Sequence, residues 1–97
     1  MNYEVIWSNF AEKQLDEIFN YYVENVSIKV AKSILHKIIS EPNKILTDPE
    51  MLQVEELLID RKDIYRYLIC LNYKIIYTID RTHQLIKITD VFDTRQN

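Results

Sequence analysis

The spacing of apolar residues changes once along the chain. From residue 9 to about residue 46, apolar side chains recur every three or four positions, which is typical of amphipathic helices. From residue 65 to residue 92 they tend to alternate with polar side chains, which is typical of strands. The segment Tyr3–Trp7, before the helices, also reads as a short strand. The expected order is therefore a strand, two helices, and three or four strands.

The helical half is expected to form a hairpin. Ser8 and Asn9 are both suited to cap the first helix, and Glu12 follows Asn9 at the spacing of a capping box. This helix should end near Glu24, and Ser27 is suited to cap the next one. So short a break should leave the two helices antiparallel. Their apolar faces comprise Ala11, Leu15, Ile18, Phe19 and Tyr22, then Val30, Ala31, Ile34, Leu35, Ile38 and Ile39.

Three strands are expected in the second half, with a possible short one near Gln53–Leu57. Tyr65–Leu71 is apolar at almost every position and so resembles a strand covered on both sides. Tyr73–Asp80 alternates, with its odd-numbered positions apolar or aromatic. Tyr73 and Tyr77 should therefore pack in the core. In Gln84–Phe92, the residues expected on one face are Ile86, Ile88 and Phe92.

The 97 residues, read as one domain over positions 1–97, include no glycine, whereas about seven would be usual. The turns must then use other residues, and Asn72 and Asp80 are the expected substitutes. Glycine-rich phosphate loops and dinucleotide-binding fingerprints are excluded. His36 and His83 lack cysteine or histidine at metal-ligand spacing. We therefore expect no metal and no small-molecule cofactor.

Charge is divided unevenly along the chain. Residues 1–60 carry five lysines against eleven acidic residues, whereas residues 61–97 carry seven basic residues against four aspartates. An anionic partner is therefore expected to bind the last third of the chain. The alternative is that this charge distribution arises by chance, since the chain is short. Cys70 is the single cysteine, so no intrachain disulfide forms. Without a signal-peptide pattern or an apolar run long enough for a membrane, a cytoplasmic location is expected.

The order of elements, the segment "YRYLICLNYKIIYTID" and the ending "DVFDTRQN" together resemble the RelE/ParE superfamily of bacterial type II toxins. The similarity is greater to the ParE-like (plasmid stabilisation) branch. It implies an α+β fold in which a helical hairpin packs on a twisted antiparallel sheet. It also implies a toxin that a cognate antitoxin neutralises by wrapping a flexible segment around it. RelE-like members cut messenger RNA on the ribosome, and ParE-like members are associated with inhibition of DNA gyrase.

The resemblance also assigns positions in the site. In the RelE-like pattern, basic residues on the middle strands and after the last strand act on RNA, with a tyrosine in the tail. Lys74 matches a strand arginine, and Arg95 matches the arginine after the last strand. The two expected lysines fall at Tyr65 and Tyr67, and no tyrosine follows Arg95. This departure favours a ParE-like toxin that acts by binding. The alternatives are a RelE-like endoribonuclease and a non-toxic remnant that keeps only its partner surface.

Two sets of contact residues are predicted. The cations are expected to form a basic patch for gyrase or the ribosome, and they would be the catalytic candidates in a nuclease. Alternatively, Arg66 pairs with Glu55 or Glu56 in the preceding linker, Lys74 is an ordinary surface residue, and Asp93 only holds Arg95. The predicted target-binding residues are Arg66, Lys74, Arg95, Tyr65 and Tyr67. The antitoxin is expected to dock on the hairpin and sheet at Leu15, Phe19, Tyr22 and Phe92.

Overall fold

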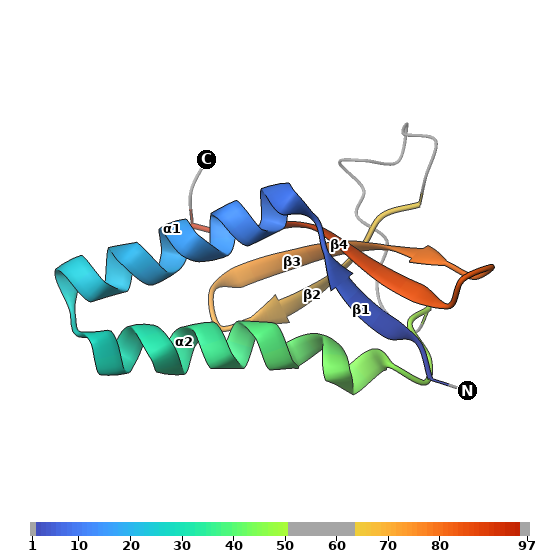
Figure 1. The fold of residues 1–97 in the computed structure, drawn as a ribbon, viewed down its shortest axis with the longest axis horizontal. Coiled ribbons are helices and arrows are strands. Elements are labelled where there is room, and N and C mark those ends of the chain that lie inside the picture. Colours follow the sequence, from blue (N-terminus) through green and yellow to red (C-terminus); the bar gives the residue numbers. More distant parts are fainter. Residues whose placement is uncertain (1, 51–63, 96–97) are drawn as a thin grey trace.

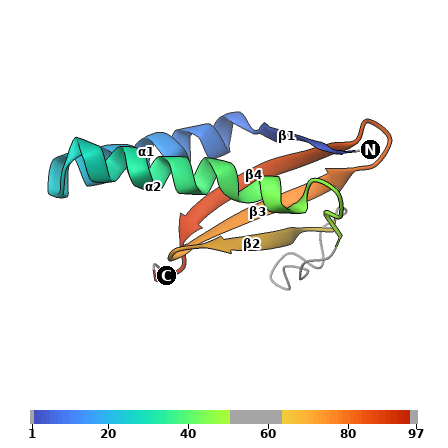
Figure 2. The ribbon, with the colours of Figure 1, turned by 90° about the horizontal axis from the view of Figure 1, so that it is seen from below.

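The computed structural model of the protein describes residues 2–50 and 64–95 and has two layers (Figures 1 and 2). A helical hairpin covers one face of a four-stranded sheet, which confirms the predicted α+β fold. The strand expected near Gln53–Leu57 lies outside the described residues. In chain order the elements are β1 (Glu4–Trp7), α1 (Asn9–Asn25), α2 (Ile28–Ser40), the 3-10 helix η1 (Glu41–Ile45), β2 (Arg66–Cys70), β3 (Tyr73–Asp80) and β4 (Leu85–Asp93).

Serine side chains cap both helices. Ser8 Oγ accepts a hydrogen bond from the backbone N–H of Ala11 at 3.0 Å, and Ser27 Oγ accepts one from Val30 at 3.1 Å. Ser8 was one of two predicted caps for the first helix, and Ser27 was the predicted cap for the second. The capping box built on Asn9 is wrong, because Asn9 is already the first helical residue. Ser8 keeps the extended backbone of β1 and donates its N–H to Ile88 O, so it is the last residue before the turn into the helix.

The strand order is β1-β4-β3-β2. β3 lies in the middle and pairs antiparallel with β2 and β4, as expected of the three later strands. β1 pairs with β4 in parallel, so the sheet is mixed and the first strand lies beside the last. Two antiparallel helices follow β1, and they cover the face of the sheet where the core forms (Figure 2).

A β-bulge changes the phase of β4. Ile76 lies opposite Asp90 and Tyr77 opposite Ile88, so Thr89 has no partner position on β3. After this extra residue, Val91 points into the core at 1% exposure, whereas Phe92 is 38% exposed. The prediction that Phe92 shares a face with Ile86 and Ile88 is therefore wrong. A strict period of two fails wherever one strand inserts a residue.

The predictions for β2 and for the turns also need correction. β2 is an edge strand, and Ile69 on it is 51% exposed, so β2 is not covered on both faces within the described residues. Positive φ angles occur at Leu71 (57°) and Gln84 (53°), not at Asn72 or Asp80. Asp80 does shape its turn, because its Oδ1 accepts the backbone N–H of His83 at 3.1 Å.

The core lies between the hairpin and the sheet. Tyr73 and Tyr77 are buried in it, as predicted. Tyr77 also donates its hydroxyl hydrogen to Pro49 O at 2.6 Å, which fastens the segment after η1 to the middle of the sheet. Across positions 2–50 and 64–95, no helix has both the length and the apolar content needed to cross a membrane. The fully buried large side chains are Tyr77, Ile38, Ile75, Ile86, Ile88, Val91 and Pro42.

Candidate functional site

The register of β2 and β3 assigns the predicted site residues to different faces of the sheet. Residues directly opposite each other in a ladder share a face. Arg66 lies opposite Tyr77, which is buried beneath the helices, so Arg66 belongs to the helix-covered face. Lys74 lies opposite Ile69 on one side and Phe92 on the other. These three residues belong to the face turned away from the helices, which we call the outer face.

Lys74 is the centre of the outer-face site. Its Nζ lies 4.2 Å from the centre of the Tyr67 ring, within the range of a cation–π interaction. On the neighbouring strands, Ile69 is 51% exposed and Phe92 is 38% exposed. The outer face therefore presents a cation held over an aromatic ring and bordered by accessible apolar side chains. Tyr65 lies just before β2 and is partly buried.

Arg66 is held against the other side of the sheet. One of its terminal nitrogens donates to the backbone carbonyl of Glu50 at 3.1 Å. Burial raises the pKa of Tyr77 to about 12, and the positive charge of Arg66 opposes this rise. Arg66 and Lys74 are thus separated by the sheet itself. Because neighbouring strand positions alternate between faces, the structure does not bring the predicted cations into one patch.

Arg95 is fixed by Asp93, as one of the alternatives predicted. Its Nε donates to Asp93 Oδ1 at 3.1 Å, one terminal nitrogen donates to Oδ2 at 2.9 Å, and its backbone N–H donates to Oδ1 at 2.8 Å. These hydrogen bonds hold the pKa of Asp93 well below its usual range, and those from the Arg95 side chain contribute more than the one from its backbone. Asp93 lies opposite Tyr73 on the helix-covered face. The guanidinium therefore lies near α1 and not on the outer face.

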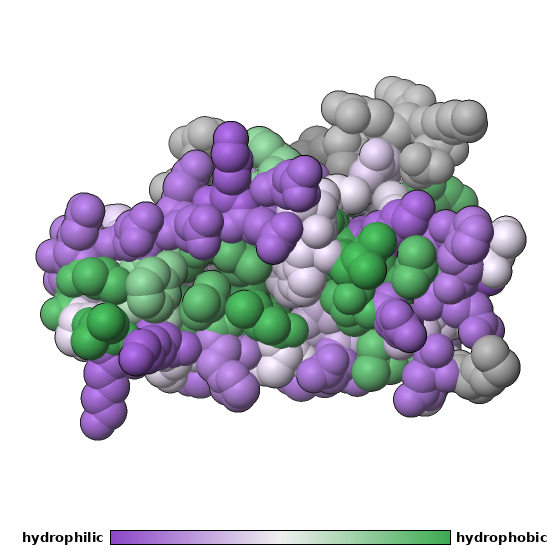
Figure 3. Space-filling view, viewed as in Figure 1, coloured by the Kyte–Doolittle hydropathy of each residue, from purple (hydrophilic) through white to green (hydrophobic). Residues whose placement is uncertain are grey.

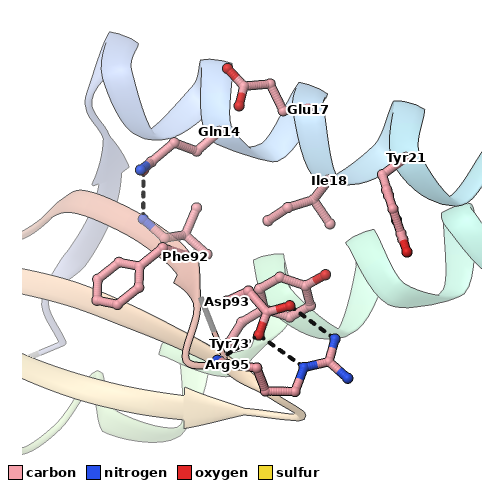
Figure 4. A pocket seen from close by; sticks show the side chains of 9 residues that line it. Gln14, Glu17, Ile18, Tyr21, Tyr73, Phe92, Asp93 and Arg95 are labelled. Carbon is pink, nitrogen blue, oxygen red and sulfur yellow. Dashed lines mark hydrogen bonds and ion pairs between the residues drawn. The ribbon is translucent and has the colours of Figure 1, made fainter. Parts of the chain in front are cut away.

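A cavity of about 340 Å³ lies between α1 and the end of β4 (Figure 4). Tyr21 points from α1 toward the side where Asp93 and Arg95 lie, and Glu17 points away from that pair. Gln14 closes one end by accepting the N–H of Val91 at 2.7 Å. Since Asp93 and Arg95 neutralise each other, the cavity suits an uncharged or apolar group of a partner more than an anion. Gln14, Glu17 and Tyr21 share a helix flank, and this spacing was the signal available in the sequence.

A second cavity, of about 620 Å³, lies beside the turn between β3 and β4. Arg66, Arg81 and Lys87 are among the residues that line it. Arg81 pairs with Glu50 at 2.8 Å, and Lys87 pairs with Asp80 at 3.3 Å. Acidic partners thus offset much of its positive charge. Among the described residues, no group of three or more His, Cys, Asp or Glu is placed to hold a metal ion.

The predicted antitoxin contacts differ in accessibility. Leu15 is 7% exposed and belongs to the core, because its turn of α1 faces the sheet. Tyr22 packs against the core, and its hydroxyl accepts from Tyr73 at 3.1 Å. Phe19 is partly buried, and Phe92 is exposed on the outer face. Phe19 and Phe92 are therefore the two that a partner reaches without rearrangement of the core.

The fold is shared with solved toxin–antitoxin structures. The chain is similar to one in the chromosomal ParDE system from P. aeruginosa, with a TM-score of 0.75 and 14% identity over 94% of this chain and 95% of the other. It is similar to a chain of the RelBE2 complex from Mycobacterium tuberculosis, with a TM-score of 0.64 and 16% identity over 96% and 99%. It is also similar to a chain of the archaeal RelE–RelB complex from Pyrococcus horikoshii OT3, with a TM-score of 0.65 and 16% identity over 100% of both chains. The chain thus shares its fold with chains of these three structures.

The family is shown by the sequence. The family model described as "ParE toxin of type II toxin-antitoxin system, parDE" matches residues 5–97. The chain therefore belongs to the ParE toxin family of type II toxin–antitoxin systems, which confirms the resemblance found in the sequence. No match was found among curated proteins.

Proposed function

We propose that this protein is a cytoplasmic ParE-like toxin that binds an essential target of the gyrase type, and that a cognate antitoxin neutralises it. The observation that supports binding over RNA cleavage is the separation of Arg66 from Lys74 by the sheet. The ParE family match points the same way. The three solved relatives, described as ParDE, RelBE2 and RelE–RelB systems or complexes, support an antitoxin partner.

Metal-free RNA cleavage needs several groups around one phosphate. Cations must stabilise the charge of the transition state, and other groups must move protons. The positions of the RelE-like lysines hold Tyr65 and Tyr67, of which Tyr67 lies on the outer face, and Arg66 between them belongs to the opposite face. Arg95 has two of its guanidinium nitrogens committed to Asp93. Among the described residues, the other two predicted cations, Arg66 and Arg95, thus lie on the opposite face of the sheet from Lys74.

The outer face is better suited to contact with a protein. Tyrosine and exposed apolar side chains around one cation are typical of binding hot spots. We place the target contact at Lys74, Tyr67 and Tyr65, with Arg66 and Arg95 outside it. Phe92 lies directly across the ladder from Lys74. An antitoxin segment that covers Phe92 would therefore also block the target contact, which gives a simple route to neutralisation.

A supercoiling assay tests the proposed target. Purified toxin should inhibit DNA gyrase, and Lys74→Ala should weaken inhibition about tenfold, as expected for a hot-spot side chain. Lys13→Ala removes the same charge from the exposed surface of α1 and should leave inhibition unchanged. Absence of inhibition by the folded wild-type protein would rule out gyrase as the target.

A translation assay tests the RelE-like alternative. The toxin should leave messenger RNA intact on translating ribosomes. Cuts in the ribosomal A site that disappear with Lys74→Ala or Arg95→Ala would support the nuclease instead. A protein inactive in both assays that still binds the antitoxin encoded by a neighbouring reading frame would be a partner-binding remnant. For that binding, Phe19→Ala and Phe92→Ala should each weaken the complex.

A further inference from the structure

The two helices of the hairpin carry opposite charge. α1 has four acidic residues and one lysine, a net charge of −3. α2 has three lysines and no acidic residue, a net charge of +3. The helices lie side by side along the same layer (Figures 1 and 2), so one surface of the molecule has an acidic side and a basic side. A partner that matches it must be basic where it meets α1 and acidic where it meets α2.

Contacts with the sheet show which flank of each helix faces the other helix. Gln14, Glu17 and Tyr21 of α1 line the cavity beside β4, so this flank is turned toward β4. The helix η1, which continues α2 from Glu41, contacts β2, and the charges of Lys37 and Glu41 both act on the pKa of Cys70 in β2, so this flank is turned toward β2. The opposite flank of each helix therefore borders the seam of the hairpin. These seam flanks hold Glu12, Asp16, Phe19 and Val23 on α1, and Ile28, Lys32, Leu35 and Ile39 on α2.

The seam leaves apolar surface exposed. Val23 is 38% exposed, Ile28 is 56% exposed and Ile39 is 45% exposed. Figure 3 shows this side of the molecule, with an apolar band between α1 and α2 and hydrophilic surface along both of its borders. Contiguous apolar surface with a polar rim marks a site of protein contact. We call this surface the hairpin face, and its members are Glu12, Asp16, Phe19, Val23, Ile28, Lys32, Leu35 and Ile39.

We propose that two copies of this chain pair through the hairpin face, about a two-fold axis that runs along the helices. Such an axis places α1 of each copy over α2 of the other, so the acidic rim meets the basic rim twice and the apolar bands meet in the centre. An in-plane axis across the helices would instead place α1 on α1 and lysine on lysine. The charge pattern therefore favours the first arrangement, in which the flank that holds Glu12 and Asp16 of each copy faces the flank that holds Lys32 of the other.

This pairing goes beyond the proposed function and is independent of the target. It does bear on regulation, because Phe19 lies in the hairpin face and is also a proposed antitoxin contact. A second copy and the antitoxin segment would then compete for the same surface. Free toxin should be dimeric, and the antitoxin should convert it to a complex in which this surface is occupied by the antitoxin.

A charge-swap experiment tests the pairing. Asp16→Lys puts a cation on the acidic rim, and Lys32→Glu puts an anion on the basic rim. Each variant alone places like charges together twice in a symmetric dimer, so self-association should weaken about ten- to hundredfold. An equimolar mixture of the two should form a heterodimer as readily as the wild type, because both rims are then complementary. Sedimentation velocity of the full chain, free of antitoxin, gives the oligomeric state of each sample.

Matched controls use the flanks that face the sheet. Glu17→Lys and Lys37→Glu change the net charge by the same amounts outside the hairpin face and should leave the dimer intact. Circular dichroism establishes that each variant is folded. A wild-type chain that stays monomeric at its highest soluble concentration would overturn the proposal. In that case the hairpin face would be an interface for the antitoxin alone. A dimer that tolerates both rim reversals, or a variant mixture that stays monomeric, would also overturn it.

Discussion

The ammonium group of Lys74 lies 4.2 Å from the centre of the Tyr67 ring, across the ladder that joins β2 and β3. Tyr67 is one of the positions where RelE-like toxins are expected to carry a lysine. An aromatic ring at this position attracts the cation of Lys74, whereas a second lysine would repel it. The Tyr67 ring is thus suited to holding the Lys74 side chain in place for contact with a partner.

The interaction between Lys74 and Tyr67 should be measurable as a coupling energy. In a double-mutant cycle of Tyr67→Leu and Lys74→Met, we expect a coupling of about 0.5–1 kcal/mol in the free energy of unfolding. Tyr67→Phe keeps the ring and should retain most of it. Urea denaturation of the four proteins gives the cycle. A coupling within error of zero would mean that the close approach contributes nothing to stability.

The hydrogen bond from Tyr77 to Pro49 should stabilise the fold more than most single contacts. Tyr77 is fully buried, and its hydroxyl lies 2.6 Å from Pro49 O. In Tyr77→Phe the carbonyl loses its buried donor, and stability should fall by about 1–3 kcal/mol. Tyr21→Phe removes a hydroxyl from a ring that is 57% exposed and should change stability by less than about 0.5 kcal/mol. Equal effects in the two variants would show that the bond has no special role.

The faces of the strands could be predicted only where no residue was inserted. Alternation in β3 correctly placed Tyr73 and Tyr77 in the core, because β3 runs without an extra residue. The same rule failed at Phe92, because Thr89 bulges from β4 and shifts every later side chain to the other face. Ser8 Oγ donates to Thr89 O at 3.2 Å, so a residue far away in sequence contacts the bulge. The alternation of residues within β4 gives no sign of that long-range contact, so the bulge could not be predicted from it.

The site was predicted less well than the fold for a related reason. Arg66 and Lys74 are both on even-numbered positions, so alternation continued through the turn would put them on the same face. A two-residue turn pairs even positions on one strand with odd positions on the next, and here it sets Arg66 opposite Tyr77. The pairing of Asp93 with Arg95 was predictable, since the two residues are close in sequence. The parallel pairing of β1 with β4 depends on the whole chain and had no local signal.

The absence of glycine leaves a strained turn that can be relieved. Leu71 joins β2 to β3 with a φ of 57°, where its Cβ crowds the backbone. Leu71→Gly should stabilise the protein by about 0.5–1 kcal/mol, the relief being partly offset by the extra freedom of glycine in the unfolded chain. Leu71→Ala keeps a Cβ and should have almost no effect. Thermal or urea unfolding compares the three, and a destabilised glycine variant would show that Leu71 is not strained.

Acid should weaken the turn between β3 and β4. The pKa of Asp80 is lowered from 3.8 to about 2. The main causes are hydrogen bonds from the side chain and then the backbone N–H of His83, and a hydrogen bond from the Lys87 side chain adds to them. A carboxyl group whose pKa is lower in the folded protein stabilises the fold above the unfolded pKa, near 3.9. Its contribution should therefore be complete above about pH 4 and decline as the pH falls toward 2.

Variants of the same turn separate these contributions. Stability curves between pH 5 and about pH 2 should be shallower for Asp80→Asn than for the wild type, because the amide does not titrate. His83→Ala removes the first cause of the shift and should flatten the curve nearly as much, whereas Lys87→Ala should flatten it less. If Asp80→Asn follows the wild-type curve throughout, the ion pairs of this turn, at 2.9 Å to His83 and 3.3 Å to Lys87, do not contribute to acid sensitivity.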